Sequence, residues 1–281
     1  MNRPGGGGLD LDRVRVLVDR AGRLGRRGIG RLGQEIEDIR LTAEQRRLIL
    51  GPAHLGWSGH SAAVNRECWS EWDWSRAGEE WTASEEWKQA LIDDVLARWM
   101  PDRGVVLEIG PGAGRWSRVL LGRAERLILV DVSPRPLELC RREFAGAGNV
   151  DYVLSAGADL PGVADASVDG VWSFDVFVHV APSDQAGYLG EVERVLAPGG
   201  VAVIHHADGR NRGRLPSRQG WRSPMSRGLF AALARRSGLT VERQLDSWGP
   251  GGRFELAAYG DVVTVCGKPP AGGRARGGSC A

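Results

Sequence analysis

Short apolar runs alternate with amphipathic segments across residues 105–266, and this alternation constrains the fold more than any other feature of the chain. The apolar runs predict strands and the segments between them predict helices, at the pitch of βαβ units. Such units build a parallel sheet with helices on both faces, and the last two strands, which have no helix between them, favour an antiparallel edge. The predicted strands are 105–109, 127–130, 151–154, 169–174, 201–206, 239–248 and 261–266, and the predicted helices lie near 115–123, 135–144, 183–196 and 225–237.

The region before the first strand predicts helices of its own. Apolar positions occur at helical spacing within residues 11–50, and a further helix is predicted from Ser84 to Met100, with Thr82 and Glu85 at capping-box spacing. We therefore expect a helical cap or lid over residues 11–83 and a main domain over residues 84–267. The remaining ends, 1–10 and 268–281, are rich in Gly, Pro and Arg and are expected to be disordered tails.

The overall composition gives charge no global role. The chain has 281 residues, and 37 basic against 35 acidic residues leave a net charge of +2, which requires neither nucleic acid nor an anionic membrane as partner. The four cysteines show no CxxC spacing, so neither a zinc site nor a disulfide framework is predicted. No signal peptide and no membrane span is recognisable, and we expect a cytoplasmic protein.

Three glycines follow the first predicted strand in the stretch VVLEIGPGAGRW. Gly110, Gly112 and Gly114 stand between a strand and a helix, where the backbone must turn sharply and can approach a ligand closely. A tight turn without a ligand is the alternative. Arg115 occupies the position at which a GxGxxG dinucleotide fingerprint would need its last glycine, so the pattern disfavours NAD or FAD.

Asp131 falls at the end of the next predicted strand. A carboxylate at that place can accept two hydrogen bonds from the hydroxyls of a ribose. It could instead cap the following helix, but Ser133, directly before Pro134, already supplies a cap. The pattern therefore favours ribose binding by Asp131.

The motifs in this order resemble the class I S-adenosylmethionine-dependent methyltransferases. After the glycine loop and Asp131 come GADLP (157–161), SFDVFVHV (173–180) and RVLAPGG (194–200), and the likeness spans roughly residues 85–267. The resemblance implies a doubly wound, Rossmann-like sheet of seven strands in the order 3-2-1-4-5-7-6, with the seventh strand antiparallel. It also implies S-adenosyl-L-methionine as cofactor, bound at the carboxyl ends of the first strands, and S-adenosyl-L-homocysteine as product.

The resemblance also implies roles for single residues. Glu108 and the backbone of Gly110 and Gly112 would hold the methionine end of the cofactor, whose amino group is cationic. Asp131 would hold the ribose. Asp159 would accept a hydrogen bond from the adenine amino group, although a turn residue before a proline is an alternative reading. The complete set of cofactor candidates is Glu108, Gly110, Gly112, Gly114, Asp131, Val132, Ala158, Asp159, Leu160 and Ser173.

Three histidines are the catalytic candidates. Methyl transfer requires alignment of the nucleophile and, for a hydroxyl or ammonium, removal of its proton. His179 follows the fourth strand and could act as a base, or could orient or pack. His205 and His206 end the fifth strand, and because alternate residues face opposite sides of a sheet, only one of them can point at the site. The same alternation argues against a metal pair, and no metal is predicted.

Acceptor candidates come from two further segments. The stretch ECWSEWDWSRAGEEW, residues 67–81, combines four tryptophans with five carboxylates, which suits a lid that offers aromatic faces and negative charge to a ligand. Alternatively, the tryptophans pack the lid and the acids stay in water. The substrate-binding candidates are Glu79, Glu80, Trp81, Trp221 and Arg222, whereas Trp69 and Trp72 are predicted to pack.

The predicted function is methyl transfer to N or O of a small polar natural product. A cationic aminosugar of the aminoglycoside kind would suit both the aromatic faces and the acids, and the Arg, Gly and Ala rich composition resembles that of high-GC actinobacterial proteins, whose methyltransferases often modify antibiotics. The alternatives are an RNA or protein methyltransferase and a noncatalytic cofactor-binding relative. Nucleic acid is disfavoured, because no RNA-binding module or strongly basic domain is present. A homo-oligomer stays open.

Overall fold

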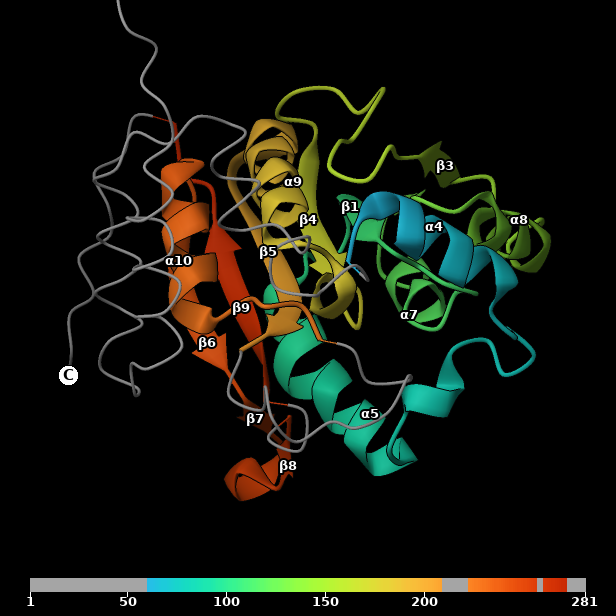
Figure 1. Ribbon diagram of the computed structural model, residues 1–281, viewed down its shortest axis with the longest axis horizontal. Helices are drawn as coiled ribbons and strands as arrows, with labels where there is room; N and C mark the ends of the chain where they lie inside the picture. Colours follow the sequence, from blue (N-terminus) through green and yellow to red (C-terminus); the bar gives the residue numbers. More distant parts are fainter. Residues whose placement is uncertain (1–59, 209–221, 257–259, 272–281) are drawn as a thin grey trace, which may run out of the picture. The chain divides into compact units, whose positions relative to one another are not determined.

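The computed structural model describes residues 60–208, 222–256 and 260–271, which form one seven-stranded sheet with helices on both faces (Figure 1). The strand order is β3-β2-β1-β4-β5-β9-β6; β1 to β5 run parallel, and β9 runs antiparallel to both β5 and β6. This confirms the predicted order 3-2-1-4-5-7-6. The strands are β1 (Val105–Ile109), β2 (Arg126–Asp131), β3 (Val150–Leu154), β4 (Val168–Ser173), β5 (Leu196–Ala207), β6 (Thr240–Leu245) and β9 (Asp261–Gly267).

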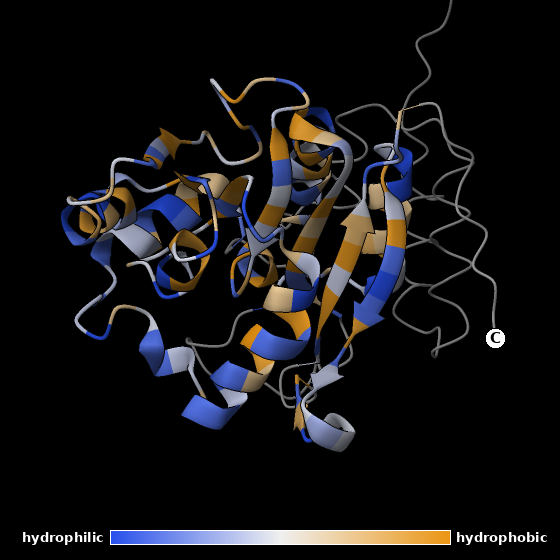
Figure 2. Ribbon diagram, turned by 180° about the vertical axis from the view of Figure 1, so that it is seen from behind, coloured by the Kyte–Doolittle hydropathy of each residue, from blue (hydrophilic) through white to orange (hydrophobic). Residues whose placement is uncertain are grey.

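The helices fill two layers because the central strands are apolar on both faces. Leu107 and Ile109 of β1 belong to a core shared with α9 and α10, whereas Val106 belongs to a second core shared with α5, α7 and α8. Figure 2 shows the corresponding hydrophobic colouring along the central strands. The helices are α4 (Ala62–Glu71), α5 (Glu85–Leu91), α6 (Ala97–Trp99), α7 (Ser117–Leu121), α8 (Pro134–Glu143), α9 (Pro182–Val195) and α10 (Arg227–Arg236).

The helix before β1 differs from the prediction in two ways. Its N-cap is Ser84, whose Oγ accepts a hydrogen bond from the Trp87 backbone N at 3.1 Å, and not Thr82. The predicted continuous α-helix is also interrupted, because Ile92–Leu96 forms a π-helical turn between α5 and α6. A strand predicted over 239–248 likewise divides: β6 ends at Leu245, and β7 (Ser247–Trp248) pairs with β8 (Phe254–Glu255) in a separate hairpin.

The segment before α5 lies against the ends of the strands. Ser61 caps α4, and along this helix Arg66 Nε donates to the Val132 carbonyl at 2.9 Å. At its far end the Ser70 and Ser133 hydroxyls lie 2.8 Å apart. These contacts place α4 over the carboxyl end of β2, where open α/β sheets bind ligands. The rest of the cap expected over residues 11–83, the tail 1–10 and part of the tail 268–281 lie outside the described residues.

Candidate active site

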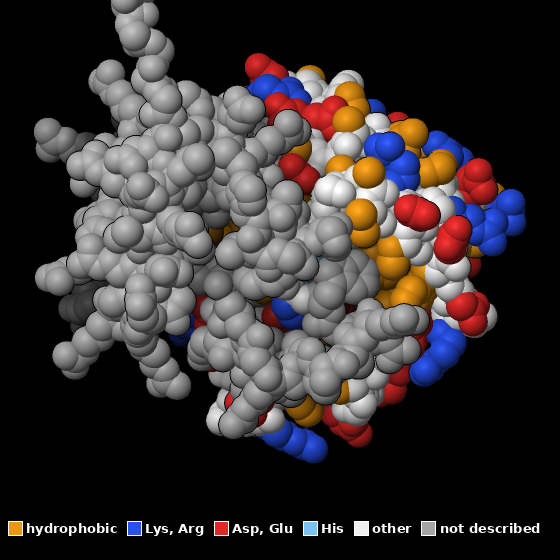
Figure 3. Space-filling model, in the orientation of Figure 1, with side chains coloured by type: hydrophobic (Ala, Val, Ile, Leu, Met, Phe, Trp, Pro, Cys, Tyr) orange, Lys and Arg blue, Asp and Glu red, His pale blue; other side chains and the backbone are white. Residues whose placement is uncertain are grey.

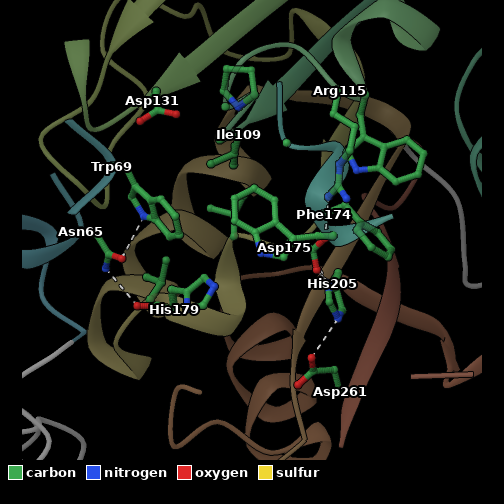
Figure 4. Close-up of a pocket in the computed structure, with 18 of the residues that line it drawn as sticks. Asn65, Trp69, Ile109, Arg115, Asp131, Phe174, Asp175, His179, His205 and Asp261 are labelled. Atoms are coloured by element: carbon green, nitrogen blue, oxygen red, sulfur yellow. Dashed lines mark hydrogen bonds and ion pairs between the residues drawn. The ribbon is translucent and has the colours of Figure 1, made fainter. Parts of the chain in front are cut away.

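A cavity of about 880 Å³ lies at the carboxyl ends of β1, β2, β4 and β5 (Figure 4). The glycine loop and Asp131 line one side of it, the tryptophans of the 67–81 stretch line another, and residues from β5, β8 and β9 complete it. On the outer face drawn in Figure 3, Lys and Arg side chains of the described residues are interspersed with Asp and Glu. The cavity gathers segments from more than half the length of the chain, so its lining is a product of the fold.

The glycine loop has a backbone that only glycine accommodates easily. Gly110 (φ 74°) and Gly112 (φ 56°) both line the cavity in left-handed conformations. A Cβ at Gly110 would lie 2.3 Å from Cγ2 of Val176, and one at Gly112 would lie 2.8 Å from the Trp74 ring. Gly114 does not line the cavity; a Cβ there would meet Phe144 at 2.9 Å. The first two glycines therefore shape the cavity, and the third permits packing of the helix layer.

Asp131 faces the cavity as predicted from its position. Its side chain is buried, its Oδ1 accepts a hydrogen bond from the Ser133 backbone N at 2.8 Å, and Val132 beside it also lines the cavity. Burial raises the pKa of Asp131 to about 7, against backbone hydrogen bonds that lower it. Ser133 is the N-cap of α8 through its hydroxyl, so Asp131 does not cap this helix. A buried carboxylate at a cavity wall is suited to a ligand that brings hydroxyl donors.

Glu108 lies beneath the glycine loop and is not among the cavity-lining residues. It is almost fully buried, and the Ser117 hydroxyl donates to its Oε2 at 2.5 Å. Burial raises the pKa of Glu108 to about 8, although the Ser117 hydrogen bond and the charge of Arg115 act in the opposite direction. The role carried over for Glu108 at the methionine end stays a prediction.

The GADLP stretch reaches the cavity through Gly157 only. The Asp159 Oδ1 accepts hydrogen bonds from the Ser155 hydroxyl at 2.8 Å and from the Ala156 backbone N at 2.7 Å, which matches the turn alternative. Ala158 and the buried Leu160 do not line the cavity either. Their adenine-binding roles stay predictions.

Ser173 ties two strands together. It is fully buried, and its hydroxyl donates to the Ile109 carbonyl at 3.0 Å, which joins the end of β4 to the end of β1. It is absent from the cavity lining. Ser173 therefore joins two strands below the cavity, and its role in cofactor binding stays a prediction.

The two neighbouring histidines point to opposite faces of the sheet. His205 lines the cavity and stacks on Phe174 at a centroid distance of 4.4 Å. His206 is fully buried on the other face, where it stacks on Phe230 at 3.8 Å and its Nε2 lies 2.7 Å from Thr264 Oγ1. His206 is therefore removed from the catalytic candidates. Among the described residues no cluster of three or more His, Cys, Asp or Glu could hold a metal ion.

The surroundings of the two histidines shift their pKa values in opposite directions. Burial alone would lower the pKa of His205, but hydrogen bonds and charges from Asp175 and Asp261 outweigh it and raise the pKa. For His206, burial dominates and lowers the pKa to about 3. The Asp175 backbone N also donates to His205 Nδ1 at 3.1 Å, so this ring nitrogen is already engaged, which makes His205 a poor candidate for a general base.

His179 also lines the cavity, next to the tryptophan segment. Its ring meets the Trp69 ring at a centroid distance of 5.3 Å. Its backbone oxygen accepts from Asn65 Nδ2 of α4 at 2.9 Å, so the loop after β4 is fastened to α4 (Figure 4). The side chain is positioned at the cavity, and its catalytic role stays a prediction.

The four tryptophans of the 67–81 stretch form one wall of the cavity. Every pairwise contact between them that the structure shows has a centroid distance of 5.3 to 6.2 Å. Three of the indole N–H groups donate to nearby residues of the chain: Trp69 to Asn65, Trp72 to Glu80, and Trp74 to the Trp69 carbonyl. The division predicted from the sequence is too simple, because Trp69 and Trp72 pack and line the cavity at once.

The two adjacent acids of this stretch differ. Glu79 forms an ion pair with Lys88 and accepts from the Thr82 hydroxyl at 2.6 Å, and it does not line the cavity. Glu80 does line it; Oε1 accepts from Trp72, and the buried Oε2 has no hydrogen-bond partner among the described residues. Of this pair, Glu80 is therefore the one available to a ligand.

Arg222 lines the cavity and its Nε donates to Asp261 Oδ2 at 3.0 Å. Trp221, its predicted companion, lies outside the described residues. Among the lining residues that sequence reasoning missed are Arg115, Asp175 and Asp261. Asp175 follows a predicted strand inside the SFDVFVHV motif, and Arg115 follows the glycines, so their positions were the available signals.

Comparison with known proteins supports a methyltransferase. Residues 107–204 match the family described as methyltransferase domain. The chain is 37% identical over 140 residues to dimethylglycine N-methyltransferase of Parasynechococcus marenigrum, covering 48% of this chain and 49% of that protein. It is 37% identical over 110 residues to a putative O-methyltransferase of Mycobacterium bovis, covering 36% and 47%. The chain thus spans about half the length of the curated relatives it matches.

Solved structures show the same fold at low sequence identity. A putative methyltransferase of Haloferax volcanii, solved in complex with the Trm112 activator, covers 73% of this chain and 97% of that chain at a TM-score of 0.56 and 22% identity. A TehB-like S-adenosylmethionine-dependent methyltransferase of Corynebacterium glutamicum covers 69% and 94% at 0.50 and 21%. The [4+2]-cyclase SpnF covers 72% and 84% at 0.50 and 18%. The fold is therefore the Rossmann-like methyltransferase fold.

These matches imply S-adenosylmethionine as the cofactor, and the residues present fit it. The glycine loop forms a cradle that a Cβ at Gly110 or Gly112 would fill, and the buried Asp131 carboxylate lies at the cavity wall on the next strand. No helix in the described part of the chain is long and apolar enough to cross a membrane.

Proposed function

We propose that the protein transfers a methyl group from S-adenosylmethionine to N or O of a small polar molecule. The observation that carries this proposal is one cavity that joins the cofactor-type glycine loop and Asp131 to a wall of tryptophans and paired charges. When bound, the cofactor supplies a methyl group on a sulfonium; the acceptor's lone pair forms the new bond and the electrons of the broken bond stay on sulfur. The chain's own task is to bind, orient and exclude water.

Enclosure supports a small acceptor. The helix α4 is fastened over the strand ends by Arg66 and Asn65, and the tryptophan wall continues from it. A Cβ at Gly157 would lie 2.1 Å from Cβ of Ala62, which shows how closely this helix approaches the loop after β3. A cavity covered on one side by α4 suits a small molecule better than a base in a folded RNA, which would need an open groove.

Charge supports a cationic acceptor. Six carboxylates line the cavity against three arginines, so the lining is net negative when its imidazoles are neutral. The tryptophan faces add a surface that attracts cations and stacks on sugar rings. An amine-bearing acceptor, with an aminosugar of an antibiotic as the specific hypothesis, would match both properties. The lining carboxylates are Glu80, Asp131, Asp175, Asp184, Glu255 and Asp261, and the arginines are Arg115, Arg222 and Arg253.

The relatives are compatible with a small amine as acceptor. The name of the Parasynechococcus protein states N-methylation of dimethylglycine, a small molecule with a carboxylate and a tertiary amine. The mycobacterial relatives are named as O-methyltransferases, so oxygen is the other candidate nucleophile. A screen of the acceptor must therefore include small amino acids, aminosugars and hydroxylated compounds.

Two measurements test the proposal. Titration calorimetry with S-adenosylhomocysteine should show binding in the micromolar range or tighter, and absence of binding would overturn the proposal as a whole. A screen with methyl-labelled S-adenosylmethionine over amines and alcohols should then give methyl incorporation into at least one class. If the protein binds the cofactor but transfers no methyl group, and instead converts a substrate to a product without a new methyl group, a role like that of the cyclase SpnF would be favoured.

A further inference from the structure

Asp175 stands at the centre of the cavity in a backbone conformation that side chains rarely adopt. It lies two residues after Ser173, the last residue of β4; its φ is +62°, and it is one of the few described residues other than glycine with a positive φ. Such conformations persist where the surrounding structure holds them, and they cluster at functional sites. The carboxylate lines the cavity (Figure 4).

Two buried side chains fix this carboxylate from opposite sides. The Asp175 Oδ2 accepts from Arg115 Nη2 at 2.5 Å, and the Asp175 backbone N donates to Nδ1 of His205 at 3.1 Å, with Oδ1 lying 3.2 Å from the same nitrogen. Arg115 is 5% exposed and lies over the Trp116 ring at 5.0 Å, and His205 is 1% exposed. Because neither partner can turn away, the orientation of the carboxylate is set before any ligand arrives.

The partners also fix its charge. Burial alone would raise the pKa of Asp175, but the charges and hydrogen bonds of Arg115 and His205 hold it well below the usual range. His205 is supported from behind by Asp261, whose Oδ2 lies 3.4 Å from Nε2. The carboxylate of Asp175 therefore stays ionised at any physiological pH. With its side chain 23% exposed, it reaches the cavity further than either partner does.

The sheet order gives Asp175 its place relative to the cofactor loop. Along the edge formed by the carboxyl ends of the strands, the spatial order is Asp131 after β2, the glycine loop after β1, Asp175 after β4 and His205 on β5. Val176, the next residue after Asp175, is the one that closely faces Gly110. Asp175 thus lies across the glycine loop from the ribose candidate, on the β4 and β5 side of the cavity.

We propose that Asp175 binds the amino group of the acceptor at the reacting position, with Arg115 and His205 as positioning residues that hold it there. The inference rests on the proposed function and narrows it to an amine. A fixed carboxylate accepts the N–H hydrogen bonds of the amine and stabilises the positive charge that arrives on the nitrogen as the methyl group is transferred. The amine reacts in its neutral form, so an amine that arrives protonated first gives a proton to water; its lone pair then bonds the methyl carbon, the electron pair of the broken C–S bond stays on sulfur, and the new ammonium loses its proton to water afterwards.

The cofactor analogue sinefungin tests this without knowledge of the acceptor. It carries an amine-bearing carbon in place of the methyl sulfonium, so its ammonium stands at the methyl position. By calorimetry, the unaltered protein should bind sinefungin about tenfold more tightly than S-adenosylhomocysteine, because the ammonium would meet Asp175. Equal affinity for the two compounds, or a preference for S-adenosylhomocysteine, would contradict the proposal and needs no variant.

Substitution then assigns the preference to the residue. Asp175→Asn should lose sinefungin affinity by about tenfold or more and keep S-adenosylhomocysteine affinity within about threefold. The matched control is Asp151→Asn, which removes an exposed Arg–Asp pair with Arg126 (2.5 Å) outside the cavity and should change neither affinity. An equal loss for both ligands, or no loss, in Asp175→Asn would refute the assignment.

Substitution of the positioning residue His205 should give a smaller effect of the same kind. In His205→Gln the carboxylate remains but loses one support, so sinefungin should weaken by less than in Asp175→Asn, with S-adenosylhomocysteine again spared. The same ordering should appear as a raised KM for an amine acceptor once one is identified. Failure of the unaltered protein to bind S-adenosylhomocysteine at all would count against the proposed function, whereas binding without the sinefungin preference counts against Asp175 alone.

Discussion

Two carboxylates at the ends of different strands of the sheet, the buried Asp131 and the half-buried Asp175, have pKa values shifted in opposite directions. Asp131, on the cofactor side, is hydrogen-bonded by backbone N–H groups, and burial raises its pKa to about 7. Asp175, on the proposed acceptor side, is 23% exposed, and Arg115 and His205 hold its pKa well below the usual range. The difference lies in the partners, because a peptide dipole compensates a buried charge less than a guanidinium and an imidazolium do.

The two sides differ in how well their charged side chains are paired before a ligand binds. On the side proposed for the cofactor, the buried Asp131 has a pKa raised to about 7 and lines the cavity, so a ligand that supplies hydrogen-bond donors would relieve the cost of its burial. The acceptor side is internally paired and rigid before binding. Cofactor binding should therefore stabilise the protein strongly, whereas acceptor recognition should depend on geometry already in place.

The largest expected effect comes from the glycine loop. Gly110→Ala places a methyl group at φ 74° and 2.3 Å from Val176, so the loop must move away from its present path. Calorimetry should show at least a 100-fold loss of S-adenosylhomocysteine affinity, and thermal denaturation should show a lower Tm, since left-handed backbone alone costs about 1–2 kcal/mol for alanine. Gly146→Ala is the matched control, because nothing lies within 4 Å of a Cβ there. Unchanged affinity in Gly110→Ala would remove the loop from the cofactor site.

Asp131→Asn should lower the affinity for the ligand and raise the stability of the ligand-free protein. Loss of a charged acceptor for the ribose hydroxyls should cost about 10- to 100-fold in S-adenosylhomocysteine affinity, that is about 1–3 kcal/mol. Because the folded pKa lies above the unfolded value of 3.8, ionisation of Asp131 costs stability that grows as pH rises from about 4 to about 7. Without ligand, the variant should thus be more stable at pH 8, by on the order of 1–3 kcal/mol, and equal at pH 4. Urea denaturation at both pH values checks this, and a variant less stable at pH 8 would reverse the interpretation of Asp131.

Much of the cofactor side could be predicted from sequence because its parts are local. The glycine loop joins adjacent elements, and Asp131 ends the next strand, so strand and helix periodicity locate both. The strand order was implied by the family resemblance carried by five motifs. These features need only the order of elements along the chain and the rule that parallel strands end at one edge.

The acceptor side resisted prediction because its contacts are distant in sequence. Asp175 acquires its character from Arg115 and His205, and Glu79 is diverted from the cavity by Lys88, which no spacing rule reveals. The choice between His205 and His206 needed the observed register of β5, although the principle that only one could face the cavity was available beforehand. Side-chain pairing across the fold is decided by packing, and sequence patterns do not encode it directly.

Asp175→Asn should change stability in the direction opposite to Asp131→Asn. The folded pKa of Asp175 is depressed, so its ionised form contributes stability that is present above the unfolded pKa and is lost as pH falls through the folded value. At pH 8 the variant should be less stable by about 1–2 kcal/mol, and the difference should shrink in acid. Asn tolerates the left-handed backbone about as well as Asp, so the change isolates charge. If the two variants shift in the same direction at pH 8, the contrast between the two sides is wrong.

The smallest effect, and the most direct reading of local electrostatics, is the titration of His205 and His206. Both are buried neighbours on β5, so a difference between them reports their partners and not their depth. NMR of the protein with labelled histidine should show His205 titrating above 6.5, because Asp175 and Asp261 favour its charged form, and His206 remaining neutral from pH 8 down to at least pH 5. His205→Gln and His206→Gln assign the two signals by their disappearance.

The two histidines also affect stability in opposite ways. The stabilising contribution of His205 is complete below its unfolded pKa and is lost as pH rises through the folded value, whereas His206 lowers the stability as pH falls below about 6.5. Midpoints that coincide near 6.5 would mean that neither the carboxylates nor burial acts on these rings, and Asp175 would then lose one of the two supports that fix it.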